Sequence, residues 1–159
     1  NRFTQTERLE TIGKKGINFY DLYYNRNKLT APYIKRILEY MGTDARHARV
    51  KEWYKIMNLY FSSIAIFKPL IAMEVYCKYR PTTILDFTMG WGGRLVGACA
   101  LNIPKYIGID NNTQLKLPYK KMKDLMKEVS TTTLQLYFTD AVKFDYSKIT
   151  YDMVLTSPP

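Results

Sequence analysis

The chain has 159 residues and carries 24 Lys and Arg against 14 Asp and Glu, so its formal net charge is +10. The chain has one histidine, His47, and two cysteines without C-x-x-C spacing, a set that provides no structural zinc site, so we expect no metal. No apolar run approaches the roughly 18 residues of a membrane-spanning helix, and no signal-peptide pattern opens the chain. We therefore expect no membrane partner and an intracellular protein, cytoplasmic or nucleus-associated and not secreted.

Residues 1–66 are predicted to form a helical, basic amino-terminal segment. A start signal at Thr30–Pro32 and a stop signal at Gly42 bound one helix, and a second helix is expected from near Asp44 to about Tyr60. These helices come before any pattern that indicates a strand. We therefore treat the segment as a region of its own, distinct from residues 67–159.

Basic residues are concentrated in the first half of the chain. Residues 1–80 hold 15 Lys and Arg against 7 acids, a net charge of +8 (15 − 7), whereas residues 81–159 hold 9 against 7, a net charge of +2 (9 − 7). Such an excess favours binding to a polyanion such as DNA, and Tyr23, Tyr24 and Tyr54 are candidate stacking groups beside it. The alternatives are that the lysines only keep a solvated face soluble and that the tyrosines belong to the core.

Residues 67–159 begin with Phe67–Met73, which is predicted to be an ordinary core helix with Pro69 in its first turn. Cys77, a little further on, is expected to be a packed thiol. A buried parallel strand follows over 82–87, because a β-branched, apolar run comes directly after a proline.

A glycine-rich turn ends this strand. It contains Gly90, Gly92 and Gly93, and a helix of small residues begins at Arg94. Glycines permit a positive φ and a close approach of the backbone, while the first turn of a helix offers unpaired N–H donors. The turn is therefore predicted to hold a polar, nucleoside-like ligand.

A second strand is predicted over 105–110, and an amphipathic helix over 118–129 follows it. An acid at the end of the second strand can accept two hydrogen bonds from ribose hydroxyls. Asp110, with its neighbour Asn111, is therefore the best candidate for binding the ribose of a cofactor. The alternative is that Asp110 caps a helix that begins at Asn111.

Two further strands are predicted, over 132–138 and 151–156. The first is followed by Asp140 and Ala141, and the second by Ser157-Pro158-Pro159. Two prolines fix φ and remove two N–H donors, so this backbone presents rigid carbonyl acceptors that suit an exocyclic amine. Four strands with intervening helices predict an α/β fold.

The glycine turn and the terminal prolines together resemble a known family. Asp86 precedes Gly90 by four residues, which gives D-x-x-x-G-x-G, and no glycine stands three residues beyond Gly92. With Ser157-Pro158-Pro159 downstream, this order resembles the S-adenosylmethionine-dependent amino-methyltransferases of DNA, whose motifs read D-P-F-x-G-x-G and [DNS]-P-P-[YFW]. The chain has Phe87 and Thr88 where the family commonly has Pro and Phe, and it stops before the aromatic residue.

The resemblance covers residues 67–159 and implies a Rossmann-like methyltransferase sheet, of which the first four of seven strands are visible. We accordingly expect the chain to be truncated at its C-terminus. The implied cofactor is S-adenosylmethionine, and the implied binding residues are Asp86, Thr88, Gly90, Gly92, Asp110, Asn111, Asp140, Ala141, Phe67 and Lys68.

Within this set, Asp140 inherits contact with the adenine amino group. A plain turn or capping residue is the alternative for Asp140. Phe67 and Lys68 inherit a place beside the methionine end of the cofactor, and the ordinary core helix described above is the alternative for them.

The implied catalytic residues are Ser157, Pro158 and Pro159. Hydrogen bonds from an amine to Ser157 and to a proline carbonyl would favour a pyramidal, more nucleophilic nitrogen. The expected reaction is methyl transfer to adenine N6 or cytosine N4 of DNA after base flipping. The alternatives are an RNA or protein-glutamine N-methyltransferase, a catalytically inactive cofactor- or nucleic-acid-binding subunit, and a NAD-dependent dehydrogenase. The oligomeric state is not predicted.

Overall fold

The structure is a computed structural model that describes residues 3–13, 15–26, 32–62 and 65–157. Contacts between residues divide the chain into two compact units. The sheet unit contains Asn1–Gln5 and Ile66–Pro159, and the helical unit contains Thr6–Ala65. The division falls next to the boundary expected between residues 66 and 67, whereas residues 1–5 group with the sheet and not with the helices that they precede.

A four-stranded, all-parallel sheet forms the centre of the sheet unit, so the α/β class is confirmed. Its strands are β1 Thr83–Asp86, β2 Lys105–Asp110, β3 Thr133–Phe138 and β4 Met153–Val154, in the order β3-β2-β1-β4. Each strand lies within its predicted range, although β4 is shorter than expected. The chain moves outward from β1 to β3 and then returns to the other side of β1, which places the topological switch point between β1 and β4.

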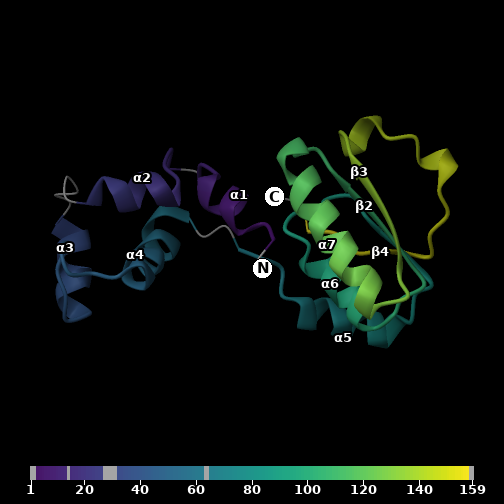
Figure 1. Ribbon diagram of the computed structural model, residues 1–159, viewed down its shortest axis with the longest axis horizontal. Coiled ribbons are helices and arrows are strands. Elements are labelled where there is room, and N and C mark those ends of the chain that lie inside the picture. The colour runs from purple at the N-terminus through teal and green to yellow at the C-terminus, as the bar shows by residue number, and fades with distance from the viewer. Residues whose placement is uncertain (1–2, 14, 27–31, 63–64, 158–159) are drawn as a thin grey trace. The chain divides into compact units, whose positions relative to one another are not determined.

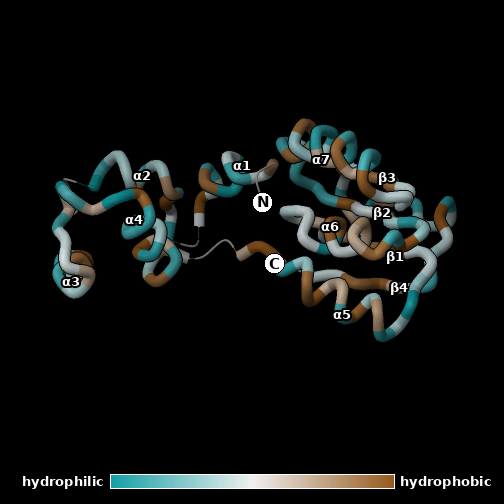
Figure 2. Tube along the Cα trace, turned by 60° about the horizontal axis from the view of Figure 1, so that its bottom comes forward, coloured by the Kyte–Doolittle hydropathy of each residue, from teal (hydrophilic) through white to brown (hydrophobic). Residues whose placement is uncertain are grey.

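Three helices cover one face of this sheet: α5 Pro69–Tyr79, α6 Gly93–Ala100 and α7 Lys116–Val129 (Figure 1). Figure 2 shows the hydrophobic stretch of α6 between α5 and α7. The core beneath them includes Ala72, Tyr76, Ile84, Leu95, Ala98, Tyr106, Tyr119 and Met122. Helices α5 and α6 meet at Gly97, where an added Cβ would lie 2.9 Å from the Cβ of Ala72.

Pro69 occupies the first turn of α5, as predicted. The expectation that Cys77 is packed is wrong, because its side chain is exposed. Ala72 and Tyr76 define the buried stripe of α5. Cys77 follows Tyr76 by one residue and is therefore turned about 100° away from that stripe.

The opposite face of the sheet is covered by the connection between β3 and β4. Leu85, Ile107 and Ile109 pack there against side chains of residues 141–149, which include the 3-10 turns Ala141–Lys143 and Tyr146–Lys148. A depression of about 320 Å³ remains on this face, lined by Leu85, Phe87, Ala141, Val142, Tyr146, Tyr151 and Val154.

The helical unit contains α2 Phe19–Tyr24, α3 Pro32–Tyr40, α4 Val50–Ile56 and a π-helical turn Met57–Ser62, and α1 Gln5–Glu10 leads into it. Its core is built from Phe19, Leu22, Ile34, Leu38, Trp53 and Ile56. Helix α3 ends at Tyr40, and Gly42, two residues beyond it, has a φ of +71°. The predicted start signal at Thr30 and Ala31 lies outside the described residues.

The second predicted helix starts later than expected, so the prediction of a start near Asp44 is wrong. The Asp44 carboxylate accepts the backbone N–H groups of Arg46 and His47 at 2.8 and 2.9 Å and thereby closes a turn. Glu52 accepts the N–H of Arg49 at 2.9 Å, which caps the helix just before Val50. Local side-chain acceptors therefore compete with helix formation over 44–49.

Among the described residues, no helix is long and apolar enough to cross a membrane. The same residues contain no group of three or more His, Cys, Asp and Glu side chains that could hold a metal ion.

Candidate functional site

The candidate site lies where β1 and β4 end, at the switch point of the sheet. In open α/β sheets this is where ligands commonly bind. The Oγ1 atoms of Thr88, after β1, and Thr156, after β4, are 2.5 Å apart, and the N–H of Ser157 donates to Thr88 Oγ1 at 3.2 Å. The structure therefore brings Thr88 and Ser157 together. Pro158 and Pro159 lie outside the described residues.

The loop between β1 and α6 depends on two glycines with left-handed backbone. The φ angles of Gly90 and Gly92 are +53° and +83°, a conformation that costs other residues free energy. The N–H of Met89 donates to the carbonyl of Ile109 at 3.0 Å, and the N–H of Gly90 donates to the Asp110 carboxylate at 2.8 Å. The loop is thus folded back onto the end of β2.

Asp110 joins the loop to the residues after β2. One carboxylate oxygen accepts from Gly90, and the other accepts the N–H of Asn112 at 2.9 Å. The 3-10 turn Thr113–Leu115 is capped by Asn112 and not by Asp110. A carboxylate has about four acceptor positions, so Asp110, which is half-buried, can still accept two further donors. Asn111 is exposed beside it.

Asp86 occupies an interior position and does not face the surface of the loop. Its carboxylate has no exposed area and accepts Arg94 Nε at 2.6 Å, Arg94 Nη2 at 3.0 Å, the Tyr106 hydroxyl at 2.5 Å and the Thr88 N–H at 3.3 Å. Burial raises the pKa of Asp86, and the bonds from Arg94 oppose that rise. The carboxylate therefore fixes the loop from below, and its four acceptor positions are taken by the protein.

Arg94 is a site residue that the sequence did not single out. It is 3% exposed, it also donates to the Thr88 carbonyl, and its guanidinium lies 5.0 Å from the centre of the Phe67 ring. Burial lowers the pKa of Arg94, but the bond to Asp86 outweighs that effect, so the pKa is raised and the charge is kept. The signal that could have found it was a single cation at the start of an otherwise apolar helix, directly after Gly92 and Gly93.

Two buried tyrosines complete the support beneath the loop. The Tyr119 hydroxyl donates to the carbonyls of Gly90 and Met89 at 2.9 and 3.1 Å, and the Tyr106 hydroxyl donates to Asp86. Burial raises the pKa of both hydroxyls well above the ordinary value, so both remain protonated donors. The sequence did not show that these two tyrosines support the loop, because the fold of α7 and β2 brings them to it.

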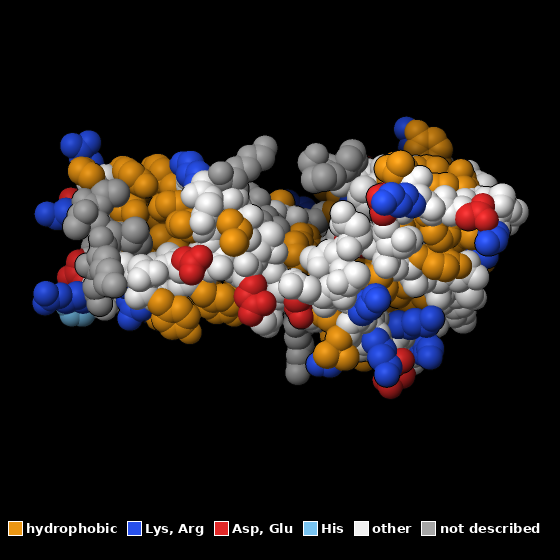
Figure 3. Space-filling model, turned by 90° about the horizontal axis from the view of Figure 1, so that it is seen from above, with side chains coloured by type: hydrophobic (Ala, Val, Ile, Leu, Met, Phe, Trp, Pro, Cys, Tyr) orange, Lys and Arg blue, Asp and Glu red, His pale blue; other side chains and the backbone are white. Residues whose placement is uncertain are grey.

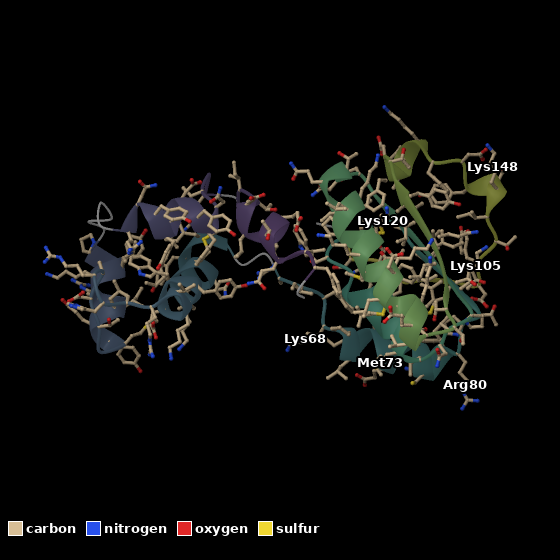
Figure 4. The ribbon with its side chains drawn as sticks, in the orientation of Figure 1. Lys68, Met73, Arg80, Lys105, Lys120 and Lys148 are labelled. Atoms are coloured by element: carbon tan, nitrogen blue, oxygen red, sulfur yellow. The ribbon has the colours of Figure 1, made fainter. Side chains whose placement is uncertain are left out.

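Phe67 and Lys68 differ in their relation to the site. An added Cβ on Gly93 would lie 1.9 Å from the Phe67 carbonyl oxygen, so the Phe67 backbone touches the start of α6. Lys68 precedes α5 as its N-cap, is exposed and extends away from the helix in Figure 4. The structure therefore brings Phe67 to the loop and leaves the Lys68 side chain in solvent.

Asp140 and Ala141 follow β3 at the same end of the sheet. Asp140 is exposed, and its carboxylate accepts the Val142 N–H at 2.9 Å, which caps the turn Ala141–Lys143. The capping alternative is therefore what the structure contains, and a further contact with adenine stays a prediction. Ala141 is half-buried and lines the depression on the opposite face of the sheet.

Comparisons of the chain with protein-family models, with curated proteins and with solved structures gave no match.

Proposed function

We propose that the chain holds S-adenosylmethionine on a Rossmann-like sheet and takes part in methyl transfer to the exocyclic amine of a DNA base. The observation that carries this proposal is the contact of Thr88 with both Thr156 and Ser157. It joins the glycine loop to the segment that leads into the two prolines. The glycine loop and Ser157 are thus adjacent at the switch point, and a transfer between two bound molecules would need its two binding segments to be adjacent in this way.

The residues at this point suit a nucleoside cofactor. Gly90 and Gly92 let the backbone approach a ligand closely, the first turn of α6 offers N–H groups, and Asp110 keeps two acceptor positions for ribose hydroxyls. When bound, S-adenosylmethionine supplies a methyl group that is already activated by its sulfonium. Asp86 contributes by shaping the loop, because its carboxylate is enclosed by Arg94 and Tyr106.

Ser157 has the catalytic role in this proposal. It is exposed, and the bond from its N–H to Thr88 fixes where the following segment begins. Its hydroxyl and the carbonyl of Pro158 would accept hydrogen bonds from the amine of the target base. These bonds orient the amine and withdraw its lone pair from conjugation with the ring, which makes the nitrogen more nucleophilic.

The helical unit supports DNA as the partner. Residues 6–65 contain 11 Lys and Arg and 6 acids, a net charge of +5 (11 − 6), and basic side chains are visible on the face drawn in Figure 3. Tyr24 is 72% exposed and stacks on Tyr20 with ring centres 6.1 Å apart, and Arg26 lies 4.4 Å from the centre of the Tyr23 ring. Exposed rings beside cations suit stacking on unpaired bases.

Tyr54, the third candidate for stacking, is engaged within the unit. Its ring centre lies 5.7 Å from that of Phe19 and 5.4 Å from the Arg8 guanidinium. Of the three tyrosines, we therefore assign contact with a base to Tyr24. A flipped base costs about a few kcal/mol to unstack, and stacking on such a ring offsets part of that cost.

Calorimetry tests the cofactor half of the proposal. The chain is titrated with S-adenosylhomocysteine and, separately, with NAD. We expect only the first to bind, and we expect Asp110→Asn to weaken that binding about tenfold or more, because hydrogen bonds to a charged group are lost. Asp124→Asn is the matched control, since Asp124 is exposed on α7 and pairs only with Lys127 among the described residues. Binding of NAD alone would overturn the proposal.

Mass spectrometry of digested substrate tests the reaction half. The protein is incubated with S-adenosylmethionine and duplex DNA, RNA or a glutamine peptide. N6-methyladenine or N4-methylcytosine in the DNA digest is the expected product, and it should disappear in Ser157→Ala. Methylation of RNA or peptide alone would assign the chain to one of the other substrate classes. Cofactor binding without transfer to any of the three would identify an inactive binding subunit.

A further inference from the structure

The helical unit is inserted between two segments of the sheet unit. Residues 1–5 belong with the sheet, the chain then forms the helical unit over 6–65, and it returns to the sheet unit at Ile66. The helical unit is thus covalently attached at both ends. Thr4 lies beside the first connection, and Phe67 lies beside the second.

The first attachment ends on the tip of the glycine loop. Thr4 has no exposed area, and its hydroxyl donates to the Trp91 carbonyl at 3.4 Å. Phe3, beside it, packs on the main core of the sheet unit, as does Trp91. Because Thr4 is fully buried and bonded to Trp91, this segment packs against the loop.

The second attachment contacts the same loop where it enters α6. The Phe67 carbonyl touches Gly93, where only a residue without a Cβ fits, and the Phe67 ring packs on Arg94. Arg94 in turn holds Asp86 and the Thr88 carbonyl. Both connections to the helical unit therefore lie against the seven residues 87–93.

The bond from Thr4 acts on the peptide plane between Trp91 and Gly92. The Trp91 carbonyl and the Gly92 N–H belong to one planar unit, and this unit is followed by Gly92, whose φ is +83°. Thr4 holds its oxygen, and the Met89 carbonyl accepts its N–H at 3.3 Å. With both ends bonded, the plane keeps one orientation, and the loop keeps the shape that a ligand would meet.

We propose that Thr4 is a positioning residue for the cofactor loop, and that residues 3–5 and 67 clamp this loop at the two attachments of the helical unit. The proposal rests on the proposed function for its ligand and adds a role for a segment outside the glycine and Ser-Pro-Pro motifs. Because coupling between two sites is reciprocal, a ligand that orders the loop also holds the Thr4 segment in place.

The experiment compares Thr4→Val, which keeps the side-chain shape and removes the donor, with Thr4→Ser, which keeps the donor. Affinity for S-adenosylhomocysteine is measured by calorimetry, and amide hydrogen exchange is measured for residues 88–93. We expect Thr4→Val to weaken binding about three- to tenfold, the effect of one hydrogen bond, and to speed exchange in the loop. Thr4→Ser should stay within about twofold of the unaltered chain in both measurements.

Thr11→Val is the matched control. The Thr11 hydroxyl donates to the Glu7 carbonyl at 2.8 Å inside the helical unit, so its loss should leave affinity and loop exchange unchanged. Equal affinity and equal exchange in Thr4→Val and the unaltered chain would overturn the positioning role while the proposed function stands. If no variant binds S-adenosylhomocysteine, the proposed function fails, and faster loop exchange in unliganded Thr4→Val still decides whether the clamp exists.

Discussion

The two units of the molecule use their polar side chains in different ways. In the sheet unit, Asp86 and Arg94 form an ion pair with 0% and 4% exposed side chains, and the Asp152 carboxylate binds Thr82, which is 70 residues away in sequence. In the helical unit, the capping pairs Asn18 with Asp21 and Arg49 with Glu52 are three residues apart. In the sheet unit one pair is enclosed and the other spans 70 positions, whereas the two pairs of the helical unit are local and cap the starts of α2 and α4.

The largest expected effect follows from breaking the enclosed pair. Arg94→Met leaves the Asp86 carboxylate buried without its cation, so we expect the free energy of unfolding to fall by about 3–5 kcal/mol. Urea unfolding of the sheet unit, followed through Trp91 in a Trp53→Phe background, measures the loss. Lys127→Met removes an exposed pair with Asp124 and should cost less than about 1 kcal/mol. Equal losses in the two variants would remove the distinction between enclosed and surface pairs.

A second comparison sets one glycine from each unit against the other. Gly93→Ala places a Cβ 1.9 Å from the Phe67 carbonyl oxygen, so the backbone must shift, at an expected cost of about 1–3 kcal/mol. Gly42→Ala meets no atom within 4 Å and has only the strain of a φ of +71°, at about 1 kcal/mol. Thermal unfolding of both variants measures the difference. A larger loss in Gly42→Ala would show that the contact of Phe67 with α6 is loose.

The surface role of the helical unit predicts a smaller effect, on binding and not on stability. Tyr24→Ala should weaken the binding of a fluorescent single-stranded DNA about fivefold or more, because one stacking partner is lost. Tyr40→Ala is the control, since Tyr40 is 93% exposed on α3. Anisotropy titrations at fixed salt measure both. A loss of the same size in Tyr40→Ala would mean that exposed rings in general, and not the neighbourhood of Arg26, determine binding.

The smallest expected effect is on acid stability. Hydrogen bonds from Thr82 and Thr83 lower the pKa of Asp152 in the folded state. The stabilisation is therefore complete above the ordinary carboxyl pKa of about 4 and is lost as the pH falls through the lowered folded value. Urea unfolding between about pH 7 and pH 2 measures it. In Asp152→Asn this acid-dependent part should be absent, and parallel curves for the two proteins would contradict the role of Asp152 in holding β4.

The strands of the sheet could be predicted because their signals are local. A β-branched, apolar run directly after a proline marked β1, and the predicted 105–110 coincides with β2. The helical unit was harder, since Asp44 and Glu52 are equally compatible with a helix interior and with the caps that they form. Where the helix starts depends on which side chain accepts the backbone N–H groups over 44–49. Hydrophobic periodicity carries no information about this local competition.

The motifs of the candidate site could be predicted from the sequence, whereas the buried residues that hold the loop in place could not. Gly90, Gly92, Asp110 and Ser157 were found because glycine spacing, strand ends and prolines are visible in one sequence. The interior position of Asp86 was not, because it is set by partners on α6 and β2, 8 and 20 residues away. The contact of Thr4 with the loop could not be predicted either, because nothing in the sequence of residues 1–5 indicates that they pack with the sheet unit.

The buried Thr4 has a consequence for how the molecule is made. Its partner Trp91 lies 87 positions later in the chain, and chains are synthesised at about 5–20 residues per second. Thr4 is therefore added to the chain roughly 4–17 seconds before the carbonyl that it binds. All residues of the helical unit, 6–65, are added within that interval, before the partner of Thr4 exists. A shortened chain starting at Ile66 would keep every strand and yet lack this residue.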